Sequence, residues 1–401
     1  MGRLFALAIL CCLLMVGCAG SSTSHPGLDL PGPSRGTYLS SSSQGDFTVA
    51  LMNFILEEAG VTTRATSPVT VYSITYNTID LNGNIVVASG AVAVPTNVSS
   101  AALLSYQHST ATAKNKVPSS GGYLEGDFVL SAFAGSGKYV VCMPDYLGLG
   151  SNSSPAIHPF MHALSEASAS IDMIRATQQF LAQLSGAPSL NGKLFLAGYS
   201  QGGHATMATT KAIQETAKDL SVTASAPMAG PYDLSNTEMD FSIENPGPDT
   251  PVFMGYLAVA YNEIYGIYTS PSQVFISPYD QTAPPLYGAN SDIDWIKSRL
   301  PDTAQQMFQA TFLSGLQDPS SQVNKDLQAN NLYNWKPTMP MRLYHAYSDD
   351  IVSYNNSLLA YTTMQGLGAT QVQLVNLGTG LTHAEGIEPA VQLAREWFDT
   401  L

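Results

Sequence analysis

The spacing of apolar residues predicts alternating strands and helices along most of the chain. Residues 69–79 and 85–94 alternate apolar and polar positions like half-buried strands, and Asn82-Gly83 between them is typical of a hairpin turn. Helical spacing follows in stretches such as 164–181. Short, almost wholly apolar runs indicate further strands that are covered on both faces, at 101–106, 139–143, 194–197, 222–227, 342–345 and 372–377. The pattern predicts an α/β fold, with a mostly parallel sheet flanked by helices.

One long segment breaks this alternation. Between Pro231 and Trp335 no run is convincing as a strand, whereas Thr250-Pro251, Ser291 and Asp302-Thr303 are typical helix starts. This helical insertion is rich in large apolar side chains. Most of them should pack its own core, and some should line a substrate cavity where it meets the rest of the chain. The predicted domain boundaries are 46–230 for the first part of the core, 231–335 for the helical insertion and 336–401 for the second part of the core.

The N-terminal residues indicate export. Arg3 precedes an apolar run of thirteen residues, Leu4 to Val16, which is too short to cross a bilayer core of about 30 Å. Small residues follow the run, as at a cleavage site. We therefore predict a signal peptide over residues 1–17, and no second apolar stretch is long enough to span a membrane.

The end of this signal peptide carries a possible lipid anchor. Met15-Val16-Gly17-Cys18 resembles the lipobox of bacterial lipoproteins, in which the cysteine is acylated, although cleavage after Ala19 is an alternative. Residues 18–45 are rich in Ser, Gly and Pro, which predicts a flexible tether. The expected location is the bacterial cell envelope, with attachment to the membrane through Cys18, or otherwise the medium outside the cell.

The composition and net charge of the chain exclude several classes of protein and of binding partner. The chain has 401 residues, more than one core usually holds, and 45% are hydrophobic against 11% charged, which excludes a long disordered polyelectrolyte. The 16 Lys and Arg against 30 Asp and Glu give a net charge of −14, so nucleic-acid binding is not expected. Only Cys142 lies beyond the leader region, so the cysteines build no disulfide framework or metal site. We find no metal cluster, nucleotide loop or cofactor motif.

The pentapeptide Gly198-Tyr199-Ser200-Gln201-Gly202 supplies a candidate nucleophile. It comes directly after the apolar strand at 194–197 and directly before a helical stretch that includes Ala205 and Met207. In a G-x-S-x-G motif of this kind the serine occupies a strained strand-to-helix turn. Glycines are needed there because side chains would collide with neighbouring elements. The helix N-terminus also directs free N–H groups to the place where negative charge would form.

Ser200 needs a base and an acid to become a nucleophile. In this motif's fold both partners follow the serine along the chain, which leaves His345 and His383 as candidate bases, because His204 points along the helix. His345 ends a strand, whereas His383 stands in a loop that can reach the serine. The acid should follow the strand at 342–345. Asp349 is the first choice, and Asp350 is the alternative.

At these residues the sequence resembles the secretory lipase family of the α/β-hydrolase superfamily. The resemblance extends from about residue 45 to the end of the chain. Four segments carry it: 144–148 (PDYLG), 198–203 (GYSQGG), 345–352 (HAYSDDIV) and 382–385 (THAE). Together they are much more specific than any one of them. The resemblance implies a catalytic triad of Ser200, Asp349 and His383, and it implies that the helical insertion is a lid.

The resemblance also implies an oxyanion hole built from the backbone N–H of Gln201 and from the Asp145 region. The segment 106–110 resembles the oxyanion loop of other α/β-hydrolases, and it is an alternative source of the second donor. Two residues depart from the family pattern. Gln201 stands where the family often has Gly, and Ser353 replaces a usual Pro, which should only loosen the turn.

The expected function is therefore that of a serine ester hydrolase, a carboxylesterase or lipase. It would act on small-molecule or lipid esters with hydrophobic acyl groups, through an acyl-enzyme and without a cofactor. Three alternatives stay open at this point. The same triad would also suit an acyltransferase or a serine peptidase, and the third alternative is a surface binding protein with a vestigial site.

Overall fold

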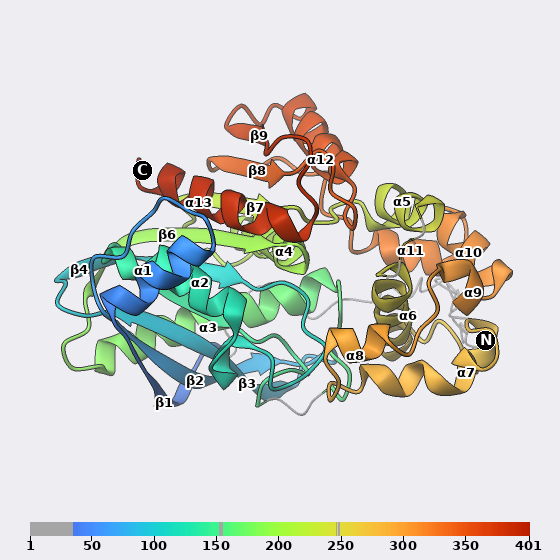
Figure 1. The fold of residues 1–401 in the computed structure, drawn as a ribbon, viewed down its shortest axis with the longest axis horizontal. Helices are drawn as coiled ribbons and strands as arrows, with labels where there is room; N and C mark the ends of the chain where they lie inside the picture. The colour runs from blue at the N-terminus through green and yellow to red at the C-terminus, as the bar shows by residue number, and fades with distance from the viewer. Residues whose placement is uncertain (1–34, 152–154, 246, 248) are drawn as a thin grey trace, which may run out of the picture.

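The computed structural model describes residues 35–151, 155–245, 247 and 249–401. Within these residues the strands form one nine-stranded sheet in the order β1-β2-β3-β5-β4-β6-β7-β8-β9 (Figure 1). The predicted signal peptide and Cys18 lie outside the described residues. The strand bounds are β1 Tyr38–Phe47, β2 Val69–Ile79, β3 Ile85–Pro95, β4 Ser100–Gln107, β5 Tyr139–Pro144, β6 Ser189–Tyr199, β7 Ala224–Met228, β8 Met341–His345 and β9 Val372–Asn376.

The sheet is antiparallel at one edge and parallel elsewhere. Strands β1, β2, β3 and β5 pair antiparallel, and β2 pairs with β3 from Val69↔Pro95 to Ile79↔Ile85, which confirms the predicted hairpin. From β5 through β4, β6, β7 and β8 to β9 every pair is parallel. The carboxyl ends of these parallel strands therefore share one edge, where loops from distant parts of the chain meet.

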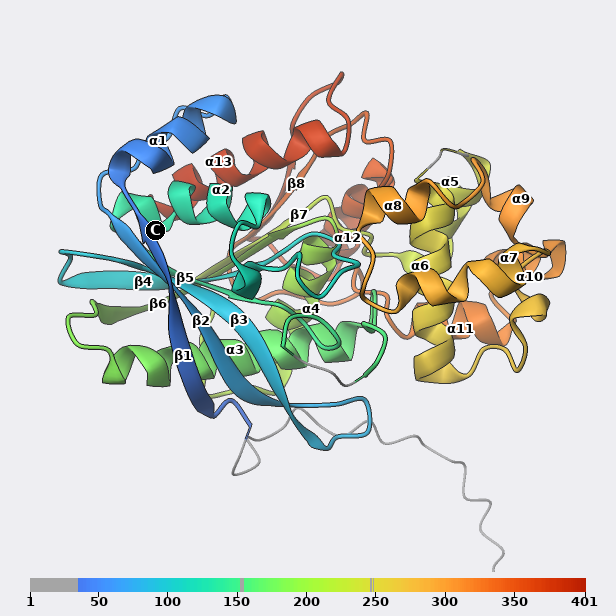
Figure 2. The same ribbon diagram turned by 60° about the horizontal axis from the view of Figure 1, so that its bottom comes forward.

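Helices cover both faces of the sheet, as the apolar strands require. Each face has its own apolar cluster of buried side chains. One cluster includes side chains from α3 (Ala163–Gln183), α4 (Gln201–Glu215) and α12 (Tyr354–Gly366). The other includes side chains from α1 (Val49–Glu58), α2 (Leu124–Ala132) and α13 (Ile387–Phe398). These three helices lie on the same side of the sheet (Figure 2). The predicted α/β architecture is confirmed.

The predicted tether is wrong for its last residues. Tyr38–Phe47 forms the edge strand β1 and pairs with β2 along its whole length, with two irregularities in the register. The Ser-rich sequence of β1 carries no strand signal, because an edge strand exposed on both faces needs no alternation of apolar and polar residues. Its backbone hydrogen bonds to β2, and not burial, hold it in place.

The segment between β7 and β8 is helical, as predicted. Its helices lie together at one end of the molecule and share a separate apolar cluster (Figure 2). The cap of α6 is Asp249, and that of α8 is Asp292, each one residue from the predicted start, while Thr303 precedes α9 as expected. No helix within the described residues is both long and apolar enough to cross a bilayer. The bounds are α5 Met239–Glu244, α6 Thr250–Tyr265, α7 Tyr279–Thr282, α8 Ile293–Lys297, α9 Ala304–Met307, α10 Ala310–Gln317 and α11 Gln322–Gln328.

Candidate active site

Ser200 occupies a strained turn between β6 and α4. Its backbone has φ 60° and ψ −122°, a conformation that residues with a side chain rarely adopt. The neighbouring glycines make the turn possible, because a Cβ on Gly198 would press on the backbone oxygen of Gly202, and one on Gly202 would overlap that of Gln107. The predicted strand-turn-helix is thus present, and strain is retained at the residue expected to react.

His383 lies beside this turn. Its ring packs against Tyr199, the residue before Ser200, with 5.0 Å between ring centroids. The Tyr199 hydroxyl donates to the backbone oxygen of His383 at 2.7 Å, which ties the loop after β9 to the end of β6. The Nδ1 atom of His383 lies 2.7 Å from Oδ2 of Asp349. The structure therefore brings Asp349 and His383 together and sets the ring next to the serine turn.

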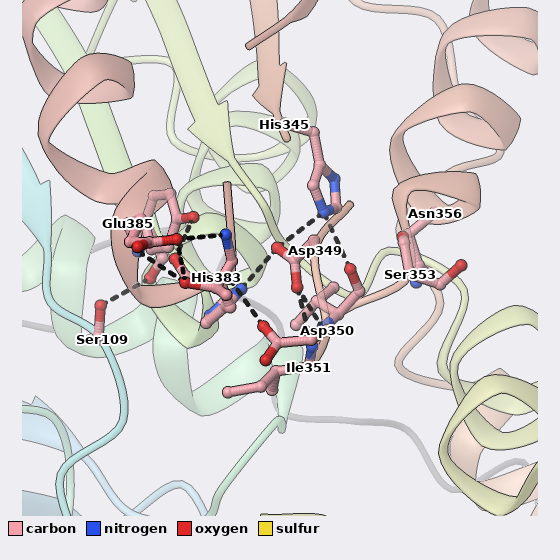
Figure 3. A network of polar contacts seen from close by, with 12 residues as sticks. Ser109, His345, Asp349, Asp350, Ile351, Ser353, Asn356, His383 and Glu385 are labelled. Atoms are coloured by element: carbon pink, nitrogen blue, oxygen red, sulfur yellow. Dashed lines mark hydrogen bonds and ion pairs between the residues drawn. The ribbon is translucent and has the colours of Figure 1, made fainter. Parts of the chain in front are cut away.

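Asp349 is buried and has hydrogen-bond partners on both carboxylate oxygens. Its Oδ1 accepts from the backbone N–H groups of Ile351 at 3.0 Å and Val352 at 2.8 Å. Its Oδ2 lies between the rings of His383 and His345 (Figure 3). Burial raises the pKa of Asp349, but the two histidines and their hydrogen bonds outweigh burial and hold the pKa well below its usual range. The carboxylate is ionised at neutral pH.

His345 is a partner of this acid that sequence reasoning missed. Its Nε2 lies 3.2 Å from Oδ2 of Asp349 and 3.0 Å from the backbone oxygen of Val352, while Nδ1 lies 2.8 Å from the hydroxyl of Ser357. With two oxygen acceptors at Nε2, that nitrogen carries the hydrogen, and Nδ1 accepts from Ser357. The spacing of four residues between His345 and Asp349, directly after a strand, is the signal that could have revealed the contact.

Asp350 contacts the backbone of the same histidine and not its ring. Its Oδ1 accepts from the backbone N–H of His383 at 2.9 Å (Figure 3). The carboxylate therefore anchors the loop, while the neighbouring Asp349 meets the imidazole. The geometry favours the first of the two aspartates as the acid.

Asp145 already uses its backbone N–H and its carboxylate in contacts with neighbouring segments, which argues against its own N–H as an oxyanion donor. The backbone N–H of Asp145 already donates to the oxygen of Ser89 at 3.0 Å. Its carboxylate is fully buried and accepts from the Ser89 hydroxyl and, at 2.9 Å, from the backbone N–H of Ser119. Asp145 holds two loops together. A donor that is already paired cannot turn to an oxyanion without breaking that bond.

The sequence suggested two other sources of an oxyanion donor, Gln201 and the segment 106–110, and their N–H groups differ in whether they are already paired. Gln201 is the first residue of α4 and is fully buried, and its backbone N–H has no acceptor among the described residues. In the loop after β4, the N–H of Ser109 donates to the carboxylate of Glu125 at 3.1 Å and is therefore occupied. The next residue, Thr110, lines the same cavity as Ser200, and its N–H likewise has no acceptor among the described residues. Thr110 belongs to the segment 106–110, which the sequence suggested as the alternative source of the second donor.

A cavity of about 480 Å³ opens at Ser200. Thr110, Ser200 and Asp350 form part of its polar wall. The apolar wall comes mainly from the helical insertion and from the loop before α3; it includes Phe160, Met161, Leu234, Met239, Phe253, Met254 and Leu257. Further polar groups of the insertion, among them Ser242, Glu244 and Asp249, also line the cavity. A pocket of this size, with an apolar wall and polar groups beside Ser200, suits a small ligand that carries a hydrophobic group.

Glu238 adds a buried acid to the cavity wall. Its Oε2 accepts from the backbone N–H of Ser353 at 3.3 Å and from the amide of Asn356 at 2.8 Å. Burial, with a smaller contribution from the charge of Asp349, raises the pKa of Glu238 to about 8. The expectation that Ser353 only loosens its turn is wrong, because proline has no N–H to donate to Glu238. The Ser353 side chain also caps α12 by accepting from Asn355.

Comparison with known proteins identifies the family. A family model described as secretory lipase matches residues 124–385, more than half of the chain. The chain belongs to the secretory lipase family. It is a carboxylic-ester hydrolase with the α/β-hydrolase fold. A comparison with curated proteins found no match.

Solved structures agree with this assignment. The rice cell wall degrading esterase LipA from Xanthomonas oryzae is 32% identical with a TM-score of 0.83, covering 92% of this chain and 100% of that one. A provisionally assigned hydrolase from Legionella pneumophila is 29% identical with a TM-score of 0.86, covering 90% of this chain and 97% of that one. Candida antarctica lipase A, at 16% identity and a TM-score of 0.66 over 90% of this chain and 83% of that one, shares the fold.

Proposed function

We propose that this secretory lipase hydrolyses esters of hydrophobic acyl groups through an acyl-enzyme on Ser200, with His383 as the base and Asp349 as the acid. The observation that carries the proposal is the 2.7 Å contact between Nδ1 of His383 and Oδ2 of Asp349, made beside the strained backbone of Ser200. The paired carboxylate and the strained serine come from two parts of the core that the helical insertion separates in the sequence. Their convergence is hard to explain by packing alone.

The contact with Asp349 determines which nitrogen of His383 acts as the base. An ionised carboxylate only accepts hydrogen bonds, so Nδ1 carries the hydrogen and Nε2 keeps its lone pair. As the Ser200 oxygen attacks the ester carbonyl, its proton passes to Nε2, and Asp349 stabilises the imidazolium that forms. The imidazolium then gives this proton to the departing alkoxide. Water repeats the sequence on the acyl-enzyme and releases the carboxylic acid.

The backbone N–H groups of Gln201 and Thr110 are the proposed oxyanion donors. Both belong to residues at the Ser200 end of the site, and neither has an acceptor among the described residues. The Gln201 N–H belongs to a fully buried residue, and buried N–H groups without a partner are rare; Thr110 lines the same cavity as Ser200. The two groups are therefore available to bind a negative oxygen. Of the two sources that the sequence suggested for the second donor, this proposal chooses the segment 106–110 over the Asp145 region.

The apolar wall of the cavity supports an acyl chain as the group that it holds. Most of this wall belongs to the helical insertion, which we propose acts as a lid over Ser200. Each buried CH₂ contributes roughly 0.8 kcal/mol of binding. Short to medium acyl esters should therefore be preferred over acetate.

A fluorophosphonate probe and the Ser200→Ala variant test the proposal together. The probe should label one site per chain in the wild type and none in the variant. Hydrolysis of p-nitrophenyl butyrate should fall on the order of a million-fold in kcat in Ser200→Ala. Residual activity within tenfold of the wild type would show that Ser200 is not the nucleophile. Added acceptor alcohol that diverted most of the acyl group to a new ester would favour an acyltransferase.

The family supports export. We further propose that acylated Cys18 attaches the exported enzyme to a membrane. The mass of the mature N-terminal peptide should show the acyl groups, and Cys18→Ser should release the enzyme from the membrane fraction. A mature chain that begins after Ala19 in the wild type would contradict the anchor.

A further inference from the structure

A buried polar cluster adjoins the serine turn on the side of α3. It consists of His158, Glu166, Gln201 and His204, and all four side chains are at most 1% exposed. Three separate parts of the chain supply them: the loop before α3, the first turn of α3 and the first turn of α4. Polar groups this deeply buried are costly unless they are fully paired, so their retention beside the nucleophile calls for an explanation.

The side chain of Gln201 is held at two points. Its Nε2 lies 2.7 Å from Nε2 of His158 and 3.1 Å from Oε1 of Glu166. His158 offers a lone pair there because its Nδ1 lies 2.8 Å from the backbone oxygen of Leu147 and so carries the ring's hydrogen. Burial lowers the pKa of His158, which keeps the ring neutral and its Nε2 an acceptor. Both hydrogens of the Gln201 amide are therefore used.

Glu166 is in turn held by His204 one helical turn further along α4. Its Oε2 lies 2.6 Å from Nδ1 of His204, whose Nε2 lies 3.0 Å from the backbone oxygen of Asn330. Both ring nitrogens of His204 therefore face oxygen atoms. Glu166 thus bridges two residues of the first turn of α4, with one carboxylate oxygen for each.

The cluster also reaches the helical insertion. Asn330 lies just after α11, and its side-chain amide donates to the hydroxyl of Tyr265 at 2.8 Å. Its side-chain oxygen accepts from the backbone N–H of Ala163, the first residue of α3, at 3.0 Å. The start of α3, the start of α4 and the insertion are thereby joined through one set of buried hydrogen bonds.

We propose that Glu166 is a positioning residue. It holds the side chain of Gln201 and so fixes the position of the Gln201 N–H, the proposed oxyanion donor, relative to Ser200. This inference rests on the proposed function. An N–H group stabilises an oxyanion only when it is fixed at hydrogen-bond distance from the place where the charge develops. A free helix terminus frays, whereas this one is tied through Gln201 and His204 to a single carboxylate. Gln201 supplies the side chain that Glu166 holds.

Two variants remove the hydrogen bond between Glu166 and Gln201 while they preserve the length of the side chain. Glu166→Met and Gln201→Met replace each polar side chain by an unbranched one of similar length. Each should lower kcat for p-nitrophenyl butyrate by about 10- to 100-fold, with KM changed less than threefold, because the donor is misplaced in the transition state more than in the ground state. Rates are expressed per site labelled by the fluorophosphonate after a long incubation, so that unfolded protein does not count.

Two further variants separate positioning from folding. Glu166→Gln should restore kcat to within about threefold of the wild type, since its oxygen still accepts from Gln201 and its NH₂ can donate to Nδ1 of a neutral His204. Gln214→Met is the matched control. Gln214 lies at the far end of α4 and hydrogen-bonds Lys336 and Thr338 across to another segment, so its loss perturbs the same helix without touching the oxyanion donor.

A boronic acid analogue of the tetrahedral intermediate supplies the second readout. Its affinity should weaken in parallel with kcat/KM in Glu166→Met and Gln201→Met, and should stay unchanged in Gln214→Met. If either Met variant folds and keeps both its titrated kcat and its analogue affinity within twofold of the wild type, Glu166 has no positioning role. That result would leave the proposed function intact, because Ser200→Ala tests it separately.

Discussion

Replacing Asp349 by Asn tests how the acid controls the base. The Oδ1 atom of Asp349 accepts from two backbone N–H groups, at Ile351 and Val352, so the single oxygen of an asparagine must take that place. Its NH₂ group then replaces Oδ2, 2.7 Å from Nδ1 of His383. An NH₂ can only donate, so Nδ1 becomes the acceptor and the ring's hydrogen moves to Nε2. The base then has no lone pair for the Ser200 proton.

The expected loss is about 10⁴-fold in kcat, which corresponds to about 5 kcal/mol of transition-state stabilisation. The assay is hydrolysis of p-nitrophenyl butyrate, with thermal unfolding and near-UV circular dichroism to show that the variant is folded. KM should change little, because the acid does not touch the substrate in the proposed mechanism.

Asp350→Asn is the matched control for this prediction. Its carboxylate accepts from the backbone N–H of His383 at 2.9 Å, and an amide oxygen can do the same. Its kcat should fall less than tenfold. The reasoning is refuted if Asp349→Asn keeps activity within tenfold of the wild type, or if Asp350→Asn is the more damaging of the two.

Three further predictions concern other parts of the site. The pKa of Glu238 is raised to about 8 from an ordinary value near 4.3, so the folded state binds more protons than the unfolded state between these values. Stability should therefore fall as pH rises through this window, by on the order of 5 kcal/mol. Glu238→Gln should flatten the dependence of Tm on pH, and equal slopes for the two proteins from pH 5 to 9 would exclude the effect. Leu257→Phe should narrow the cavity and lower kcat/KM for the octanoyl ester relative to the acetyl ester by about tenfold, the value of roughly two excluded methylene groups, and an unchanged ratio would show that the chain binds elsewhere. Gly202→Ala should destabilise the fold by about 1–3 kcal/mol or more in chemical unfolding, because its Cβ would overlap the oxygen of Gln107, whereas Gly366→Ala, with nothing within 4 Å, should be neutral or stabilising.

Much of the site could be predicted because its signals are local. The turn at Ser200 is specified by neighbouring residues, an apolar strand before it and glycines within it, and the structure shows the expected positive φ. The order of the triad residues along the chain, with the strand at 342–345, then narrowed the candidates for the acid to Asp349 and Asp350. These features depend on residues that are close in sequence, so their spacing could be interpreted without knowing the rest of the fold.

The β1 strand shows where local pattern was insufficient. Its Ser-rich residues resemble a tether, and only pairing with β2 makes them a strand. The contact of His345 with Asp349 was missed for a related reason. The strand position of His345 was correct, but the loop that returns Asp349 to its ring is determined by hydrogen bonds to Ile351 and Val352.

By itself, the sequence determined the alternation of strands and helices, the serine turn and the short set of residues able to serve as acid and base. Only the tertiary structure decided that the N–H of Asp145 is paired with Ser89, that the N–H of Thr110 has no acceptor in the part of the chain that the structure describes, and that Glu166 meets Gln201 across 35 positions. The physical reason is that the sequence shows which groups can donate or accept a hydrogen bond, whereas only the packing of the folded chain determines which partner each group meets. Local spacing specifies the reactive groups, and long-range contacts specify which of them are free to react.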